Sequence, residues 1–319
     1  MKNPLPWFWR VLAGGLLLAM LGQWLPVARA SDLPAAPATV PEATDHSVRK
    51  ILFFYRCTTY LDPVLWATNG QPGLVETVLG DVGKANHLAF TFTQDGSVFT
   101  PESLAHYDAV CFFTSGDLTA PGNDGNPPMT LAGKAALLQA IADGLGFVGI
   151  HSAAATFASG PDGVDPYVKM LGGELLNRVR GLEPAHQIVA DTNFPGLAAV
   201  PADYCPVEEW YSLRNFAPNL HVLLVMDTAN MVRGAYYAPN YPTTWARRYG
   251  RGRVFYTSLG HEAAVWNSPV FRQILTGGLR WAAGTVDAVV SPNMARVTPG
   301  VSLAPAGEPD GKLENVPGH

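Results

Sequence analysis

Residues Gly144 to Phe157 read G-L-G-F-V-G-I-H-S-A-A-A-T-F, the pattern of a buried strand followed by a sharp turn. Residues 147–150 form a short apolar run of the length that a buried strand needs. His151 and Ser152 follow at once, and small residues come after them. Open α/β sheets bind their ligands at the carboxyl ends of the strands. We therefore expect a turn like a nucleophile elbow, with His151 at its centre and next to a ligand site.

Segments with strand and helix patterns alternate through the first half of the chain. Residues at helical spacing predict helices that begin near Leu74, Thr100 and Thr130, and apolar runs between them predict strands. The second half is less regular, with a short helix at 166–171 and a final helix at 269–283. This alternation predicts an α/β fold with a mostly parallel, doubly wound sheet flanked by helices. The expected strands are residues 51–55, 88–93, 108–113, 147–150, 186–189, 207–211, 221–226 and 253–256.

The first thirty residues have the pattern of a secretory signal peptide. Lys2 and Arg10 give a positive start, Val11–Leu25 is apolar, and Ala28-Arg29-Ala30 is an A-x-A cleavage pattern. The apolar segment is shorter than the ~20 residues of a membrane span. We expect a periplasmic or secreted protein with no stable membrane span after cleavage; an uncleaved anchor is the alternative. The expected organisation is a signal peptide at 1–30, a flexible linker at 31–47, one domain at 48–285 and a disordered tail at 286–319.

Charge and cysteine content limit the classes of protein to consider. The chain has 21 basic and 26 acidic side chains, and three of the basic ones but no acidic one lie in the first thirty residues. The mature chain then carries 18 basic and 26 acidic groups, a formal charge of −8. Nucleic acid is not an expected partner, because its binding needs concentrated Lys and Arg. Cys57, Cys111 and Cys205 are too few to frame the fold, and we expect unpaired thiols, with one bridge as the alternative.

Five blocks of sequence follow one another in a recognisable order. They are Tyr107–Val110 with Gly116–Thr119, Gly146–Ala154, Glu208–Tyr211, Pro242–Trp245 and Gly250–His261. Together they resemble the ThuA-like (trehalose-utilisation) family over roughly residues 48–284. The resemblance implies a class I glutamine-amidotransferase-like, flavodoxin-like α/β sandwich, which agrees with the alternation of strands and helices.

The chain departs from the pattern of these relatives at three places. Where the amidotransferase turn has G-x-C-x-G, this chain has Gly149-Ile150-His151-Ser152-Ala153. No cysteine can act there, so amidotransferase activity is excluded. Many relatives carry a histidine in the loop after the first strand, whereas residues 56–62 contain none. The acidic pair is Glu208-Glu209 where relatives show Asp-Glu, and we align Glu209 with the family glutamate.

Two histidines are the main candidates for chemistry. His151 and His261 each follow a predicted parallel strand, so both project toward the same edge of the sheet, and Glu209 and Tyr211 alternate on one predicted strand. One hypothesis is acid–base catalysis, with His151 as base, Glu209 as its orienter or partner acid, and His261 with Tyr211 stabilising an oxyanion. Another is a metal site of His151, His261 and Glu209, for which zinc is suitable. A purely structural role for the histidines is the third.

Several further residues are candidates for binding a substrate. Aromatic rings can stack on the apolar face of a sugar, and polar side chains can hydrogen-bond to its hydroxyls. Core packing explains the aromatic residues equally well, and a helix cap explains Ser152. The candidates are Ser152, Asp117, Trp210, Trp245 and Arg247, with Arg248 as an alternative to Arg247.

The resemblance implies a role in sugar metabolism. We expect an exported protein that acts on a small carbohydrate, with 3-keto-disaccharides as candidate substrates and proton abstraction beside a sugar carbonyl as the reaction. The alternatives are a non-catalytic sugar-binding protein and a metal-dependent hydrolase. A homo-oligomer is compatible with the fold class, by analogy alone.

Overall fold

The computed structural model of the chain describes residues 47–58, 60–67, 70–122, 124–178, 181–231 and 240–303. The expected signal peptide and residues 31–46 of the linker lie outside the described residues, as do residues 304–319 of the tail. Within the described residues, no helix combines the length and the apolar character that crossing a bilayer requires.

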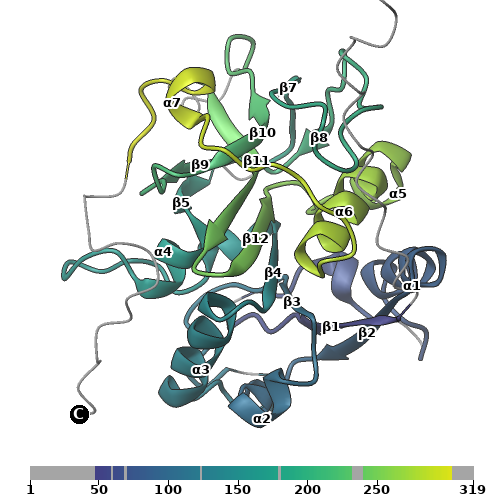
Figure 1. Cartoon of the computed structure of the whole chain (residues 1–319), viewed down its shortest axis with the longest axis vertical. Helices are drawn as coiled ribbons and strands as arrows, with labels where there is room; N and C mark the ends of the chain where they lie inside the picture. Colours follow the sequence, from purple (N-terminus) through teal and green to yellow (C-terminus); the bar gives the residue numbers. More distant parts are fainter. Residues whose placement is uncertain are drawn as a thin grey trace, which may run out of the picture. The chain divides into compact units, whose positions relative to one another are not determined.

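An eight-stranded sheet forms the centre of the fold (Figure 1). Its strand order is β2-β1-β3-β4-β12-β11-β10-β7. The first five strands in this order pair in parallel, and the last three join by antiparallel pairing. The predicted mostly parallel sheet is therefore confirmed. The strands are β1 (Arg49–Phe54), β2 (Leu88–Thr93), β3 (Ala109–Phe112), β4 (Gly146–Ile150), β7 (Gln187–Val189), β10 (His221–Met226), β11 (Tyr241–Tyr249) and β12 (Gly252–Thr257).

Two groups of helices cover the sheet (Figure 1). One group is α1 (Leu74–Asn86), α5 (Ala263–Asn267) and α6 (Pro269–Ala282), which contact one another; the other is α2 (Pro101–Leu104), α3 (Leu131–Ala142) and α4 (Pro166–Leu171). Thr100 and Thr130 cap α2 and α3 by accepting hydrogen bonds from backbone N–H groups. The caps fix where these helices begin, as the sequence predicted. Short 3-10 helices are η2 (Pro63–Leu65), η3 (Gly96–Val98) and η4 (His151–Ala155).

Buried aromatic side chains pack between α4 and the sheet. The ring of Phe112 lies within 6.0 Å of the rings of Phe147 and Tyr167, measured between centroids. Contacts of this kind add to the free energy gained by burial. Cys57, Cys111 and Cys205 are all unpaired, so packing rather than disulfide bonds holds the fold together.

The segment that was expected to be one strand, residues 207–211, is divided. β8 (Val207–Glu208) pairs with β6 (Glu183–Pro184), and β9 (Tyr211–Arg214) pairs with β5 (Glu174–Arg178). Glu209 and Trp210 lie between the two pairs. The prediction that Glu209 and Tyr211 alternate on one strand was therefore wrong, because the chain changes its pairing partner between them.

The prediction of a disordered segment from residue 286 onward does not hold for residues 286–303. This segment contains α7 (Met294–Val297), which packs against β10. The side chain of Asn293 accepts from the backbone N–H of Val222 at 2.7 Å and donates to its carbonyl oxygen at 2.9 Å. Backbone N–H of Phe216 also donates to Ser302. The Asn293 amide makes the two hydrogen bonds to Val222 that a neighbouring strand would otherwise make. Residues 286–303 are therefore part of the folded domain.

Helix α6 lies against the turn at residues 194–197 without room for a methyl group. A Cβ added at Gly277 would lie 1.9 Å from the carbonyl oxygen of Pro195. We expect Gly277→Ala to lower the free energy of unfolding by about 1–3 kcal/mol, because backbone must move apart. Gly80→Ala in α1 is the control: its Cβ would meet nothing within 4 Å, and alanine should stabilise the helix by up to about 1 kcal/mol. Urea unfolding measures both; an unchanged midpoint for Gly277→Ala would contradict the close packing.

Candidate active site

The turn after β4 holds His151 in a left-handed backbone conformation. Its φ is 45°, in a region that costs a non-glycine residue about 1–2 kcal/mol. The Tyr256 hydroxyl supports the turn by donating to the carbonyl oxygen of His151 at 2.9 Å. The sharp turn expected from the sequence is therefore present, although His151 begins a 3-10 helix in place of an α-helix. Strain of this kind concentrates at functional sites.

Two hydrogen bonds fix the tautomer of the His151 ring. Nδ1 lies 2.9 Å from the carbonyl oxygen of Ser258, which can only accept, so Nδ1 carries a hydrogen. In the neutral ring, Nε2 then has the lone pair and accepts from the Tyr211 hydroxyl at 2.8 Å. The two rings also stack, with centroids 4.4 Å apart. His151 thus presents a proton acceptor at Nε2, held in place from both sides.

His261 is a proton donor. Its Nδ1 lies 2.6 Å from Oδ2 of Asp62, whose side chain is buried. Burial alone would lower the pKa of His261. The hydrogen bond and charge of Asp62 outweigh that effect, together with the charges of Glu208 and Glu209, and raise the pKa from 6.5 to about 9. At neutral pH the ring is therefore an imidazolium.

A buried carboxylate sets the position of the loop that carries His261. Oε1 of Glu208, which has no exposed surface, accepts from the backbone N–H groups of Gly260 at 2.7 Å and His261 at 3.1 Å. Burial raises the pKa of Glu208 to about 7, because these donors and the charge of His261 offset only part of the lost hydration. Glu208 thus positions the loop, and its neighbour Glu209 faces the histidines.

Glu209 completes the surroundings of His151. Its Oε2 lies 3.9 Å from Nε2 of His151, and 8% of the residue is exposed. A carboxylate at this distance favours a positive charge on the imidazole ring. The structure therefore brings together the four residues His151, His261, Glu209 and Tyr211, which the sequence proposed as catalytic.

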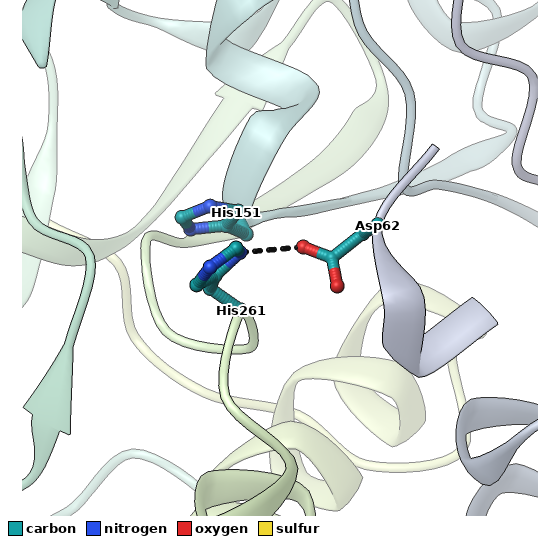
Figure 2. A group of neighbouring side chains, drawn as sticks. All are labelled: Asp62, His151 and His261. Carbon is teal, nitrogen blue, oxygen red and sulfur yellow. Dashed lines mark hydrogen bonds and ion pairs between the residues drawn. The ribbon is translucent and has the colours of Figure 1, made fainter. Parts of the chain in front are cut away.

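Figure 2 shows the two imidazole rings one above the other, with the carboxylate of Asp62 turned toward His261. The ring centroids are 5.2 Å apart. Side-chain exposure is 1% for His151 and 20% for His261, so His261 is the more accessible of the two. A proton acceptor at Nε2 of His151 beside a cationic His261 would supply the components of general acid–base catalysis.

The same group could hold a metal ion. Asp62, His151 and His261 offer ligand atoms that all lie within 4.8 Å of one another. Two imidazoles and a carboxylate suit zinc, and the Nδ1 hydrogen bond of His151 to a carbonyl is typical of a metal-bound histidine. Among the described residues, Asp62 takes the place in this set that the sequence had suggested for Glu209.

Comparison with known proteins identifies the family. The family model described as trehalose utilisation, ThuA, matches residues 64–282, which is more than half of the chain. The chain belongs to the ThuA family. No curated protein matches this ThuA sequence significantly.

Solved structures of ThuA-like proteins share the fold. The protein from Bacteroides uniformis has a TM-score of 0.59 and 20% sequence identity, covering 81% of this chain and 98% of that one. The protein from Parabacteroides merdae has a TM-score of 0.52 and 17% identity, covering 81% and 97%. The resemblance to the ThuA family and the fold inferred from it are therefore confirmed.

Three of the expected substrate-binding side chains are core residues in this ThuA chain. Trp210 and Trp245 are 1% and 0% exposed, and each ring N–H donates to a backbone carbonyl oxygen, of Glu183 and Leu171 respectively. Arg247 is 1% exposed and donates to carbonyl oxygens at the end of α4. Trp210, Trp245 and Arg247 therefore pack within the core and have almost no exposed surface with which to contact a ligand.

The remaining two expected binding residues differ in position. Asp117 is exposed and accepts from the backbone and hydroxyl of Thr119, so it closes its own turn. Ser152 is half-buried and directly follows His151, which keeps it beside the ThuA site.

Sequence reasoning missed two residues of the ThuA site. Asp62 precedes Pro63 and caps η2 by accepting from the N–H of Val64, which is sufficient reason for an aspartate there. Its second oxygen makes the contact with His261. Glu208 was noted only as part of an acidic pair, and its burial was not predicted. An Asp-Pro pair in the loop after the first strand was the one available signal.

Proposed function

We propose that this ThuA protein acts on a small carbohydrate that carries a carbonyl group, by proton transfer at the carbon next to that carbonyl. The family description, trehalose utilisation, supports a sugar substrate. A 3-keto-disaccharide is the first candidate, because oxidation at one hydroxyl makes the neighbouring C–H acidic. The signal-peptide pattern of residues 1–30 supports action outside the cytoplasm.

The single observation that carries this proposal is the pairing of His151 with His261. The lone pair on Nε2 of His151 accepts the proton from carbon. His261, cationic at neutral pH, hydrogen-bonds to the carbonyl oxygen and stabilises the negative charge that develops there. Asp62 orients that ring as the aspartate of a hydrolase triad orients its histidine.

Tyr211 and Glu209 assist the proton transfer. The Tyr211 hydroxyl donates a hydrogen bond to Nε2 of His151 in the free protein, so the substrate must displace it before the proton transfer. The displaced hydroxyl then donates to the negatively charged oxygen of the intermediate. Glu209 stabilises the imidazolium that forms on His151. Returning the proton to carbon completes an isomerisation or an exchange with solvent.

A metal-dependent hydrolase is the second candidate, and the clustering of Asp62, His151 and His261 favours it. A divalent ion would occupy the space between these side chains and supply a Lewis acid for the substrate oxygen or an activated water. Metal and proton compete for the same nitrogen atoms, so the two candidates exclude each other.

The test combines metal analysis with isotope exchange. We expect the purified protein to contain far less than one equivalent of zinc or another divalent ion. We also expect it to incorporate deuterium from D2O beside the carbonyl of 3-keto-trehalose, measured by NMR. Near-stoichiometric metal that a His151→Ala/His261→Ala double variant lacks would overturn the acid–base proposal in favour of the metal site. Saturable binding with neither exchange nor product would overturn it in favour of a sugar-binding protein.

A further inference from the structure

A cavity lies at the carboxyl ends of β1 and β2, beside the segment that carries Asp62. Its volume is about 250 Å³. β1, β2, the start of α1 and residues 61–67 contribute its lining. Small-molecule pockets usually measure about 300–1,000 Å³, so this cavity suits one small ring. The lining residues that matter here are Tyr55, Leu65, Trp66, Glu76, Phe92 and Gln94.

Trp66 differs from the other tryptophans among the described residues. Trp210, Trp245, Trp266 and Trp281 are at most 1% exposed, whereas Trp66 is 52% exposed. Its ring is nevertheless fixed, because Nε1 donates to the carbonyl oxygen of Leu61 at 3.1 Å. The exposed ring lines the cavity in one orientation, so a ligand can pack on it.

The cavity combines this ring with polar groups. Glu76 provides carboxylate acceptors, Gln94 provides an amide, and the partly buried Tyr55 provides a hydroxyl. Burial and the charge of Glu76 raise the pKa of Tyr55, so the hydroxyl keeps its proton and can donate. A pyranose ring matches this set, because one of its faces carries C–H groups that pack on an aromatic plane while its hydroxyls hydrogen-bond at the edge.

We propose that this cavity, the Trp66 pocket, binds a pyranose ring that does not itself react, so that the substrates are glycosides rather than free monosaccharides. The inference rests on the proposed function for the identity of the reacting ring. Residues 61–67 link the two places: Leu61 and Trp66 line the pocket, and Asp62 between them holds His261. A bound ring would therefore also fix the segment that orients the proton donor.

The kinetic test compares a disaccharide with a monosaccharide. Trp66→Ala is expected to raise KM for 3-keto-trehalose about tenfold and to change kcat by no more than about twofold. KM for 3-keto-glucose should stay unchanged, because only the disaccharide has a second ring to occupy the pocket. Trp66→Phe keeps an aromatic plane and should restore most of the loss. Ile188→Ala removes an exposed apolar residue from β7 at the far edge of the sheet and serves as the control. Equal KM changes for both substrates would overturn the proposal.

A binding test separates the pocket from the chemistry. Trehalose itself, titrated by calorimetry, should bind the wild-type protein and the Ile188→Ala control equally, and Trp66→Ala at least tenfold more weakly. Failure of the proposed function alone would leave this pattern of trehalose binding intact while isotope exchange is absent. Trehalose binding that Trp66→Ala leaves unchanged would overturn the pocket even if exchange occurs.

Discussion

The His151→Asn variant is expected to turn over 3-keto-trehalose about a hundred to ten thousand times more slowly than the wild type, the range for loss of a general base. Asparagine suits this position because it tolerates the left-handed backbone that His151 adopts. Its amide can also replace Nδ1 as the donor to Ser258. The substitution therefore removes Nε2 while keeping the turn, and initial rates together with the melting temperature measure the effect.

His87→Asn is the matched control for this substitution. His87 also has a positive φ, 54°, and it ends α1 on the exposed surface, away from the sheet edge that carries the site. The control should keep wild-type turnover. If His151→Asn kept full turnover with an unchanged melting temperature, His151 would not be the base. If His151→Asn lowered the melting temperature strongly, His151→Gln would be measured in its place. Glutamine keeps a polar group near the position of Nε2 but cannot act as a base.

The Asp62→Asn variant is expected to lose activity at a lower pH than the wild type. In the wild type, His261 holds its proton below a pKa of about 9, so activity that depends on the imidazolium is present below that pH and falls as the pH rises through it. Removing the charge of Asp62 lowers this pKa, and the alkaline limb of kcat/KM moves down. At pH 8.5 the loss should be about tenfold or more. Profiles of kcat/KM between pH 6 and 10 measure the shift.

A second Asp–His pair in the same chain provides the control. Oδ2 of Asp191 lies 2.9 Å from Nε2 of His221, at the start of β10. Asp191→Asn removes the same type of contact outside the site and should leave the pH profile unchanged. An alkaline limb that stays in place in Asp62→Asn would show that His261 does not need its proton for turnover.

The sequence predicted most of the parallel half of the sheet, because strands buried on both faces are continuous apolar runs bounded by polar loops. Helix α4 and strand β10 have the predicted bounds. β11 was missed, because its sequence Y-P-T-T-W-A-R-R-Y contains a proline and two arginines. Arg247 is nevertheless buried there, with its Nη1 donating to the carbonyl oxygens of Lys169 and Met170 in α4. Such compensation depends on tertiary contacts and leaves no local pattern.

The two histidines of the site were predictable from strand order, and their partners were not. Parallel strands place their carboxyl ends at one edge, and this rule alone brought His151 and His261 together. Asp62 has a complete local explanation as the cap of η2, so nothing in its neighbourhood indicates a second contact. Glu208 was passed over because Glu209 was aligned with the family glutamate. Nothing local indicates the full burial of Glu208, since carboxylates are rarely fully buried.

The position of β12 in the sheet has a consequence for how the newly made chain folds. Among the described residues, β12 is the last strand of the sheet to be synthesised. It nevertheless lies in the middle of the sheet, where it pairs with β4 on one side and β11 on the other. Until it inserts, the edge of β4 has unpaired backbone groups that can pair with another chain. The contact between Asp62 and His261, 199 residues apart, can form only after that insertion. Shortened chains that end before residue 252 would therefore lack the site. They would also expose the unpaired edge of β4 and would be prone to aggregate.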